Sequence, residues 1–335
     1  MSEQPRAVSI ALAGFGRVGR TFADTVSGSG AALLDRYGLD VRVRAIRTSA
    51  SETVSSAPGR DDPAAWRPAG SFSDFLARSG ATTLVQCIPS DTARASEAFD
   101  QVATAFSMGL DVVTATKSHL VTRWSELAEL AERERRRIRI SAAAGAALPA
   151  VDLARRGIRG FGCRRFRASL NGTSNFVLEE VVAGRSLADA IGQAQALGIA
   201  ESDPSYDLSG RDSASKLVLI ANLLWGTAWS LSDVDVAGIE ADVETRARDA
   251  ALRGWRLRSI GEAHETGAMS VAVREVDPSD AFHGLAGPEK LVEFDCPSAG
   301  EVRVSGGKSS PQGAALALLK DVVNLATGDE GLGFD

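Results

Sequence analysis

The side chains best suited to proton chemistry are concentrated between residues 201 and 216. This stretch carries four carboxylates within twelve residues and a lysine behind them: Glu201, Asp203, Asp207, Asp212 and Lys216. Asp212 and Lys216 are spaced i and i+4, which places both on one face of a helix. The pattern turns strongly apolar after Lys216, so we expect this lysine at the lip of a buried helix face. Burial disfavours its charge while the carboxylates oppose that shift, a balance that suits proton transfer.

The same spacing is also typical of a salt bridge on a helix surface, and Ser209 with Asp212 predicts a capping box at the start of this helix. Lysine usage adds weight to the catalytic interpretation. Of 37 basic residues only five are lysines, namely Lys117, Lys216, Lys290, Lys308 and Lys320. Because Arg cannot deprotonate in proteins whereas Lys can be tuned as a proton donor or acceptor, each lysine of this Arg-rich chain is a candidate for chemistry.

A second candidate site is the glycine-rich turn Gly14-Phe15-Gly16-Arg17-Val18-Gly19, which follows a buried strand pattern and opens a helical one. In that context the first glycine permits a tight turn, the second lets the backbone approach a pyrophosphate, and the third lets helix and strand pack closely. The helix N-terminus supplies N–H donors for the phosphates. The turn predicts a nicotinamide dinucleotide site, against the alternative of a structural glycine turn in an unrelated α/β protein.

The end of the second strand bears on the choice of cofactor. An acidic residue there usually binds the ribose, but residues 44–49 read Arg-Ala-Ile-Arg-Thr-Ser. Arg47 with Ser49 is suited to a 2′-phosphate, so NADP is favoured and NAD is left possible. The alternative for Arg47 is an ordinary solvated surface arginine.

The elements that must position these residues divide the chain in two. Residues 7–142 alternate strand-like and helix-like segments, which predicts an α/β fold with a doubly wound parallel sheet of Rossmann type. Residues 49–70 are expected to form a loop at the rim of that sheet. Beyond about residue 150 the segments indicate an α+β domain with a more antiparallel sheet. We expect a dinucleotide-binding domain over residues 1–145 and a second domain over 146–310.

Bulk properties narrow the classes of partner. The net charge of −6 argues against nucleic-acid or membrane-surface binding, and no apolar run reaches the roughly 18 residues of a membrane span. The N-terminus is polar and unlike a signal peptide, so the cytoplasm is expected. His119 and the widely spaced cysteines are expected to be structural, with no zinc site: Cys87, Cys163 and Cys296.

Together the motifs resemble those of the homoserine dehydrogenase family. The turn over 14–19 matches the opening of that family, and residues 112–117 (V-V-T-A-T-K) resemble its V-V-T-A-N-K. Residues 171–175 (N-G-T-S-N) resemble its N-G-T-T/S-N loop. Residues 201–216 resemble its E-x-D-P…D-x-x-G-x-D-x-x-x-K in both residue type and spacing, and this long motif is specific.

The resemblance implies a reversible NAD(P)H-dependent reduction of L-aspartate 4-semialdehyde to L-homoserine, a step of threonine and methionine biosynthesis. Lys216 would be the general acid toward the developing alkoxide, and the base in reverse, with Asp212 orienting it. Glu201 and Asp207 would face the ammonium group of the substrate.

The remaining roles follow from the same resemblance. Gly172 and Thr173 would contact substrate near the nicotinamide. Lys117 would lie where cofactor and substrate meet, as a second candidate proton donor, and Thr114 would lie beside the cofactor. The C-terminal segment 311–335, with a helix near 312–326, would return to the first domain. The second domain would bind substrate and form a homodimer.

Departures from the family keep alternatives open. Ser141 stands where the family has a Glu that helps to bind sodium, and a neutral hydroxyl is a poorer ligand for a hard cation, so no metal is expected. Thr116 replaces the Asn of V-V-T-A-N-K. One alternative is a dehydrogenase of the same fold that acts on a different amino aldehyde or amino alcohol. Another is an inactive dinucleotide sensor, against which the retained carboxylates and Lys216 argue. Since the chain ends at Asp335, we expect no small-molecule-sensing regulatory domain.

Overall fold

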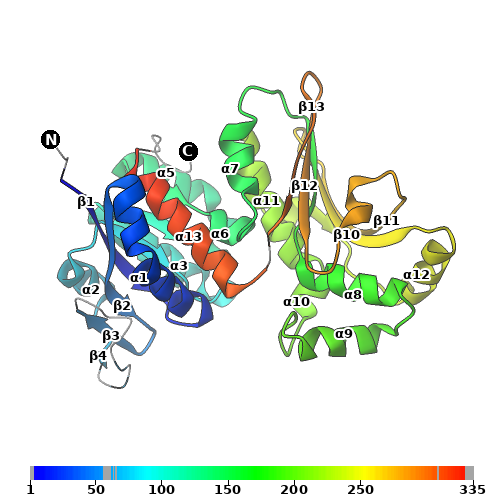
Figure 1. The fold of residues 1–335 in the computed structure, drawn as a ribbon. Coiled ribbons are helices and arrows are strands. Elements are labelled where there is room, and N and C mark those ends of the chain that lie inside the picture. The colour runs from blue at the N-terminus through cyan, green and yellow to red at the C-terminus, as the bar shows by residue number, and fades with distance from the viewer. Residues whose placement is uncertain (1–3, 56–61, 63, 65, 308, 329–335) are drawn as a thin grey trace. The chain divides into compact units, whose positions relative to one another are not determined.

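The chain folds into two compact units in a computed structural model that describes residues 4–55, 62, 64, 66–307 and 309–328. The first unit is Met1–Ala147 with Ser310–Asp335, and the second is Leu148–Ser309 (Figure 1). These ranges lie close to the domains expected over 1–145 with 311–335 and over 146–310. The functions assigned to the two domains stay predictions.

The first unit is built on a seven-stranded sheet of order β4-β3-β2-β1-β5-β6-β7. Its parallel part comprises β1 (Arg6–Ala13), β2 (Leu39–Arg47), β5 (Thr83–Gln86), β6 (Asp111–Thr114) and β7 (Ile138–Arg139). The predicted Rossmann-type sheet is confirmed. The loop expected over 49–70 is wrong in part, because β3 (Ser51–Val54) and β4 (Arg67–Pro68) add an antiparallel edge there. Within that stretch, residues 56–61, 63 and 65 lie outside the described part of the chain.

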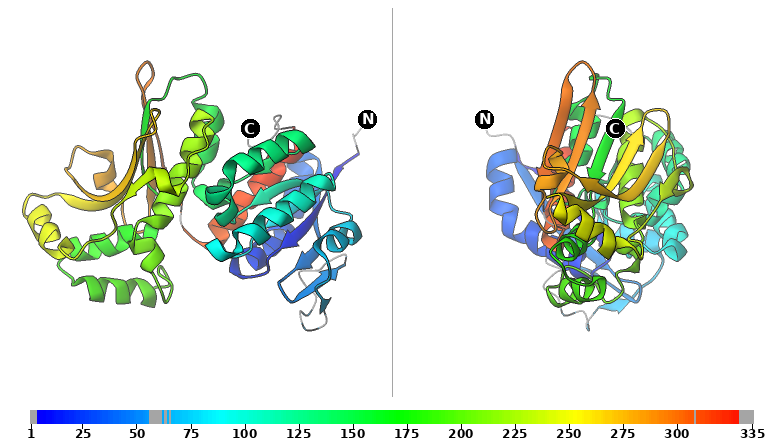
Figure 2. Two further views of the ribbon diagram at one scale, coloured as in Figure 1. Left: turned by 180° about the vertical axis from the view of Figure 1, so that it is seen from behind. Right: turned by 90° about the vertical axis from the view of Figure 1, so that its right-hand side faces the viewer.

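Helices cover the sheet of the first unit. They are α1 (Arg17–Tyr37), α2 (Phe72–Ser79), α3 (Ala95–Ser107), α4 (Ser118–Thr122), α5 (Trp124–Glu134), α6 (Ser141–Ala144) and α13 (Pro311–Ala326). The last of these closes the chain yet lies among the helices of the first unit (Figures 1 and 2). It begins at Pro311 behind the N-cap Ser310, and its buried Leu318 and Val322 share a core with Phe22 of α1. Residues 329–335 of the predicted C-terminal segment lie outside the described residues.

The second unit contains a six-stranded sheet of order β13-β12-β8-β10-β11-β9. The strands are β8 (Arg165–Ser169), β9 (Val234–Val236), β10 (Arg256–His264), β11 (Met269–Val276), β12 (Lys290–Cys296) and β13 (Gly300–Gly306). All neighbours are antiparallel except β9 and β11. The predicted α+β second domain is confirmed.

One face of this sheet carries the helices that hold the candidate site. The helices of the unit are α7 (Ala150–Asp152), α8 (Gly172–Val182), α9 (Leu187–Ala196), α10 (Ser205–Leu208), α11 (Arg211–Trp225) and α12 (Val243–Leu252). Leu257 of β10 packs with α8, α9 and α12, and Gly261 on the same strand face lies against Leu217 of α11. Within the described residues, no helix is long and apolar enough to cross a membrane.

Candidate active site

The glycine turn after β1 has the geometry that a dinucleotide requires. A Cβ on Gly14 would lie 2.4 Å from the carbonyl oxygen of Cys87, and one on Gly19 would lie 2.2 Å from the carbonyl oxygen of Gly14. Gly16 differs, since nothing lies within 4 Å of its Cβ position. Gly14 and Gly19 are therefore required by packing, whereas Gly16 leaves open space at the start of α1. Such a cradle beside helix N–H groups fits a pyrophosphate.

The other residues of the turn support this arrangement. Gly16 is the N-cap of α1 and is exposed together with Arg17. No side chain caps this helix start, so first-turn N–H groups are left for a ligand or solvent. Val18 is half-buried. The Phe15 ring is buried and packs against Trp66, with 5.3 Å between the ring centroids.

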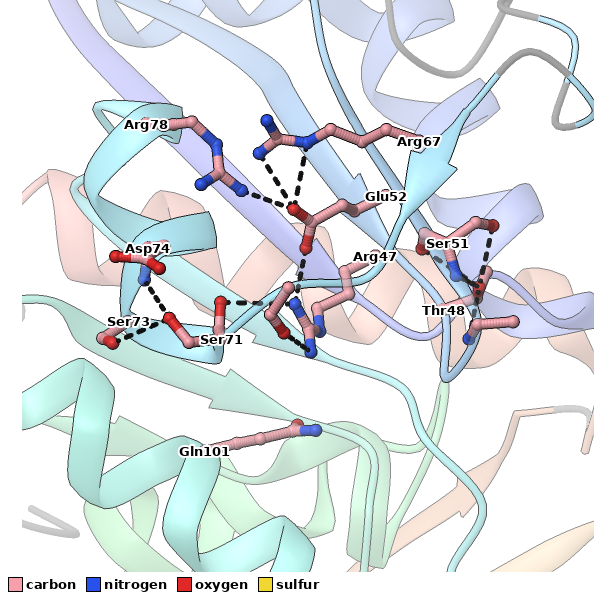
Figure 3. A network of polar contacts seen from close by, with 12 residues as sticks. Arg47, Thr48, Ser51, Glu52, Arg67, Ser71, Ser73, Asp74, Arg78 and Gln101 are labelled. Atoms are coloured by element: carbon pink, nitrogen blue, oxygen red, sulfur yellow. Dashed lines mark hydrogen bonds and ion pairs between the residues drawn. The ribbon is translucent and has the colours of Figure 1, made fainter.

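At the end of β2, three arginines surround one buried carboxylate (Figure 3). Glu52 of β3 is 1% exposed and lies opposite Arg47 in the β2–β3 register. Arg47 donates to Glu52 at 2.5 Å and to the Gly70 carbonyl at 2.7 Å. Arg67 donates to the same carboxylate at 2.9 Å, and Arg78 also pairs with it. The cluster keeps a net positive charge, because one carboxylate faces three guanidinium groups.

The ion pairs of this cluster change the interpretation of Arg47 as an arginine available for a 2′-phosphate. The predicted lone arginine is already held by Glu52, a carboxylate that comes from the neighbouring strand and not from the end of β2. The side chains of Arg67 and Arg78 are 48% and 36% exposed, against 17% for Arg47. They line a cavity of about 490 Å³ together with Glu52 and Trp66. Ser49 is exposed in the turn after β2. The binding of Arg47 and Ser49 to a cofactor stays a prediction.

The segment after β6 lies at the same edge of the parallel sheet as the glycine turn. The hydroxyl of the buried Thr114 donates to Gln86 and accepts from the Thr116 N–H, both at 3.0 Å. The backbone N–H of Lys117 donates to Ser90 at 2.9 Å, and its side chain is half-buried at the start of α4. The Thr114 side chain therefore shapes the turn that carries Lys117. Burial lowers the pKa of His119 to about 3, which keeps its ring neutral.

In the second unit, the predicted pair Asp212 and Lys216 forms a short ion pair. The Lys216 Nζ donates to Asp212 Oδ2 at 2.6 Å and to the Leu170 carbonyl at 3.0 Å. Asp212 is 5% exposed. The predicted capping box is wrong, because α11 starts after Gly210 at φ 81° with no side-chain cap, and Ser209 donates to the Tyr206 carbonyl instead. The Asp212 carboxylate therefore takes no part in a capping box and accepts from Lys216 instead.

Asn171 joins the carboxylates of this segment, a role that the sequence reasoning missed. Its Nδ2 donates to Asp207 at 2.7 Å and to Asp212 at 2.8 Å. Its Oδ1 accepts from the Ser174 N–H at 2.8 Å, which makes it the N-cap of α8. An Asn placed directly before a helix is a capping signal that a sequence can show. The hydrogen bonds to Asp207 and Asp212 could not be predicted in this way, because those residues lie 36 and 41 positions away.

The other predicted substrate residues lie on neighbouring segments. A Cβ on Gly172 would lie 2.9 Å from the Pro288 carbonyl oxygen, so the segment before β12 covers the start of α8. The Thr173 hydroxyl donates to the Ile199 carbonyl at 3.2 Å. Glu201 is exposed two residues further on, outside the contacts that join Asp207 and Asp212.

A sodium site at Ser141 does not fit the structure. The Ser141 hydroxyl donates to Asp321 at 2.9 Å and accepts from the Lys320 ammonium at 2.8 Å. Lys320 also lies 2.7 Å from Asp321, whose carboxylate is 1% exposed. A lysine ammonium thus already neutralises the buried carboxylate beside the residue that replaces the family's Glu. Within the described residues there is no cluster of three or more His, Cys, Asp or Glu side chains able to hold a metal.

Comparisons with known proteins find relatives over most of the chain. The profile described as homoserine dehydrogenase matches residues 149–323, more than half of the 335-residue chain. The chain is 28% identical to the homoserine dehydrogenase of Methanocaldococcus jannaschii, over 95% of this chain and 98% of that protein. It is 30% identical to the enzyme of Corynebacterium glutamicum over 96% and 72%. It is 32% identical to an NAD(+)-dependent homoserine dehydrogenase of Pseudomonas canavaninivorans over 66% and 64%.

Solved structures share the fold. An Archaeoglobus fulgidus protein superposes with a TM-score of 0.86 at 28% identity, over 96% of this chain and 100% of that one. A hyperthermophilic archaeal homoserine dehydrogenase in complex with NADPH superposes with a TM-score of 0.82 at 21% identity, over 98% and 99%. At that identity it shows the fold alone.

The fold, the dinucleotide cradle and these relatives define an NAD(P)-dependent oxidoreductase. The family is the one that the sequence motifs resemble. The chain belongs to the homoserine dehydrogenase family. None of the matches favours the specialised dehydrogenase or the inactive sensor.

Proposed function

We propose that this enzyme interconverts L-aspartate 4-semialdehyde and L-homoserine, with Lys216 as the group that exchanges a proton with the substrate oxygen. The observation that carries the proposal is the placement of the Lys216 ammonium. It has three N–H donors, of which Asp212 and the Leu170 carbonyl engage two among the described residues. The third remains to donate to the oxygen of an aldehyde. The bound cofactor supplies the hydride.

The Asp212 carboxylate orients Lys216 and is itself oriented by Asn171. This support limits the rotation of the ammonium, so its proton is already directed when negative charge develops on the substrate oxygen. In the reverse direction the neutral amine of Lys216 takes the proton of the alcohol. Lys117, beside the cofactor, is a second candidate proton donor in this proposal.

Asp207 and Glu201 bind the substrate ammonium, while Gly172 and Thr173 contact the amino acid at the start of α8. Asp207 is half-buried and held by Asn171, which makes it the better ordered of the two carboxylates. We expect Asp207→Asn to raise KM for the amino acid by about tenfold, the loss of one charge-assisted hydrogen bond. Asp203→Asn is the matched control, because that carboxylate is exposed and bonds to the Ser205 backbone.

The cofactor would be held by the turn over 14–19, with Thr114 and Lys117 beside the nicotinamide half. NADP is favoured over NAD because Arg47, Arg67 and Arg78 leave net positive charge at the end of β2. Among the relatives, two archaeal structures are complexes with NADPH and one protein is NAD(+)-dependent. Arg47→Ala should weaken NADPH binding more than NADH binding. Arg42→Ala on the same strand, exposed and paired with Asp40, should leave both unchanged.

The pathway, the cellular compartment and the oligomeric state in this proposal are those expected from the family. The product serves amino-acid biosynthesis, leading to threonine and methionine, and we expect the enzyme to act in the cytoplasm as a homodimer formed by the second unit. Light scattering of the purified chain tests the dimer, and a monomer mass at assay concentration would contradict it.

The decisive experiment is oxidation of NADPH and of NADH with aspartate semialdehyde beside a panel of related aldehydes. Turnover highest on aspartate semialdehyde supports the proposal, and preference for another aldehyde overturns it. Lys216→Ala should lower kcat by about 100-fold or more. A loss below about threefold would remove Lys216 from the proton-transfer step.

A further inference from the structure

The second unit buries a lysine that the proposed reaction has not used. Lys290, the first residue of β12, is 2% exposed. A buried ammonium is costly unless charged groups around it compensate, so its surroundings decide what it does.

The alternation of β12 directs this lysine toward α11. Lys290 lies on the same strand face as Val292 and Phe294. Phe294 packs against Phe166, and Phe166 packs against Trp225 of α11, each with 5.6 Å between ring centroids. Leu291, on the other strand face, joins a separate apolar cluster with Phe282 and Leu285.

The strand register places Lys290 beside the backbone segment that binds Lys216. The register of β8 with β12 pairs Ser169 with Leu291, and its continuation sets Leu170 opposite Lys290. The Leu170 carbonyl is the group that accepts from Lys216.

We propose that Lys290 is a positioning residue of the active site, which acts through Lys216 by placing a second positive charge against the Asp212–Lys216 ion pair. This inference deepens the proposed function and rests on it. When Lys290 is charged, it favours transfer of the Lys216 proton to an anionic substrate oxygen. When Lys290 is neutral, Lys216 keeps its proton more firmly.

The charged groups around Lys290 explain why its charge changes near neutral pH. Burial lowers the pKa of Lys290 to about 7, with a further lowering by Lys216, while Asp212 raises it. The residue that follows β8 is the apolar Leu170, and β13 has Gly306 at the position paired with Lys290. Three carboxylates of the adjoining segments accept hydrogen bonds of their own: Asp207 from Asn171, Glu179 from the Gly287 N–H and Glu289 from the Ala286 N–H.

Titration of the lysine side chains by NMR tests the electrostatic coupling without substrate. With five lysines in the chain, comparison with Lys290→Met identifies the signal of Lys290. We expect a midpoint near 7 that rises in Lys216→Met and falls in Asp212→Asn, as the signs of the two interactions require. A midpoint that neither variant moves would overturn the inference.

The pH dependence of aldehyde reduction tests the catalytic consequence. The wild-type rate should fall by roughly threefold to tenfold through pH 7 as Lys290 loses its charge. Lys290→Met should lack this step and stay at the high-pH rate, whereas Lys290→Arg should stay at the low-pH rate. The control Leu291→Met, on the opposite strand face, should keep the wild-type step.

The two experiments separate this inference from the proposed function. If the wild type fails to reduce aspartate semialdehyde, the proposed function fails, and the NMR titration still decides whether Lys290 is coupled to Lys216. If turnover is normal but Lys290→Met keeps the step at pH 7, the proposed function stands and the role of Lys290 is refuted.

Discussion

Replacing the buried Lys290 by methionine should stabilise the folded protein, and should do so most at low pH. The pKa of Lys290 falls from 10.5 to about 7 on folding, first through desolvation and then through Lys216. Between these two values the unfolded chain holds a proton that the folded chain does not, so stability rises with pH. At about 1.4 kcal/mol per pKa unit, the residue costs about 5 kcal/mol at pH 6.5 and about 1 to 2 kcal/mol at pH 9.5.

Urea-induced unfolding of the wild type and of Lys290→Met at these two pH values measures the difference. The variant should gain about 3 kcal/mol more at pH 6.5 than at pH 9.5, since methionine fills similar volume without a charge. Leu291→Met on the same strand provides the control, with an effect that is independent of pH. An equal gain for Lys290→Met at both pH values would refute the assignment of a depressed pKa to this lysine.

Three further outcomes are expected. Asn171→Ala should lower kcat by about tenfold or more, because it releases Asp207 and Asp212. It should also reduce thermal stability, because it removes the N-cap of α8. A change in stability alone would show that Asn171 only caps α8. Gly19→Ala should abolish dinucleotide binding or folding, since its Cβ would lie 2.2 Å from the Gly14 carbonyl oxygen, whereas Gly28→Ala, with nothing within 4 Å, should be tolerated in a thermal melt. Activity should be the same in sodium, potassium or choline chloride at equal ionic strength, because Lys320 already compensates Asp321; activation specific to sodium would contradict this.

Local spacing was sufficient to predict several features. The turn over 14–19 between strand and helix patterns indicated the dinucleotide cradle, and the i, i+4 spacing indicated the Asp212–Lys216 pair. Both depend on residues close in the chain, where helix and turn geometry decides which side chains meet. The alternation of strand and helix patterns likewise predicted the Rossmann-type sheet, because it reflects burial along single elements.

The sequence pattern could not predict contacts between residues that lie far apart in the chain. Glu52 lay in a stretch expected to be a loop, and its three arginines come from β2, β4 and α2. Asn171 reaches Asp207 and Asp212 only because α8 and α11 pack on one sheet face.

The pairing of Lys216 with Asp212 was predictable from the sequence by itself, since the two residues lie one helical turn apart. Tertiary structure alone decided that Lys290, 74 residues further along, lies buried beside the Leu170 backbone that binds Lys216. The physical reason is that the depth of burial and the approach of two like charges depend on strand register and on helix packing against the sheet. Neither property is a function of spacing along the chain.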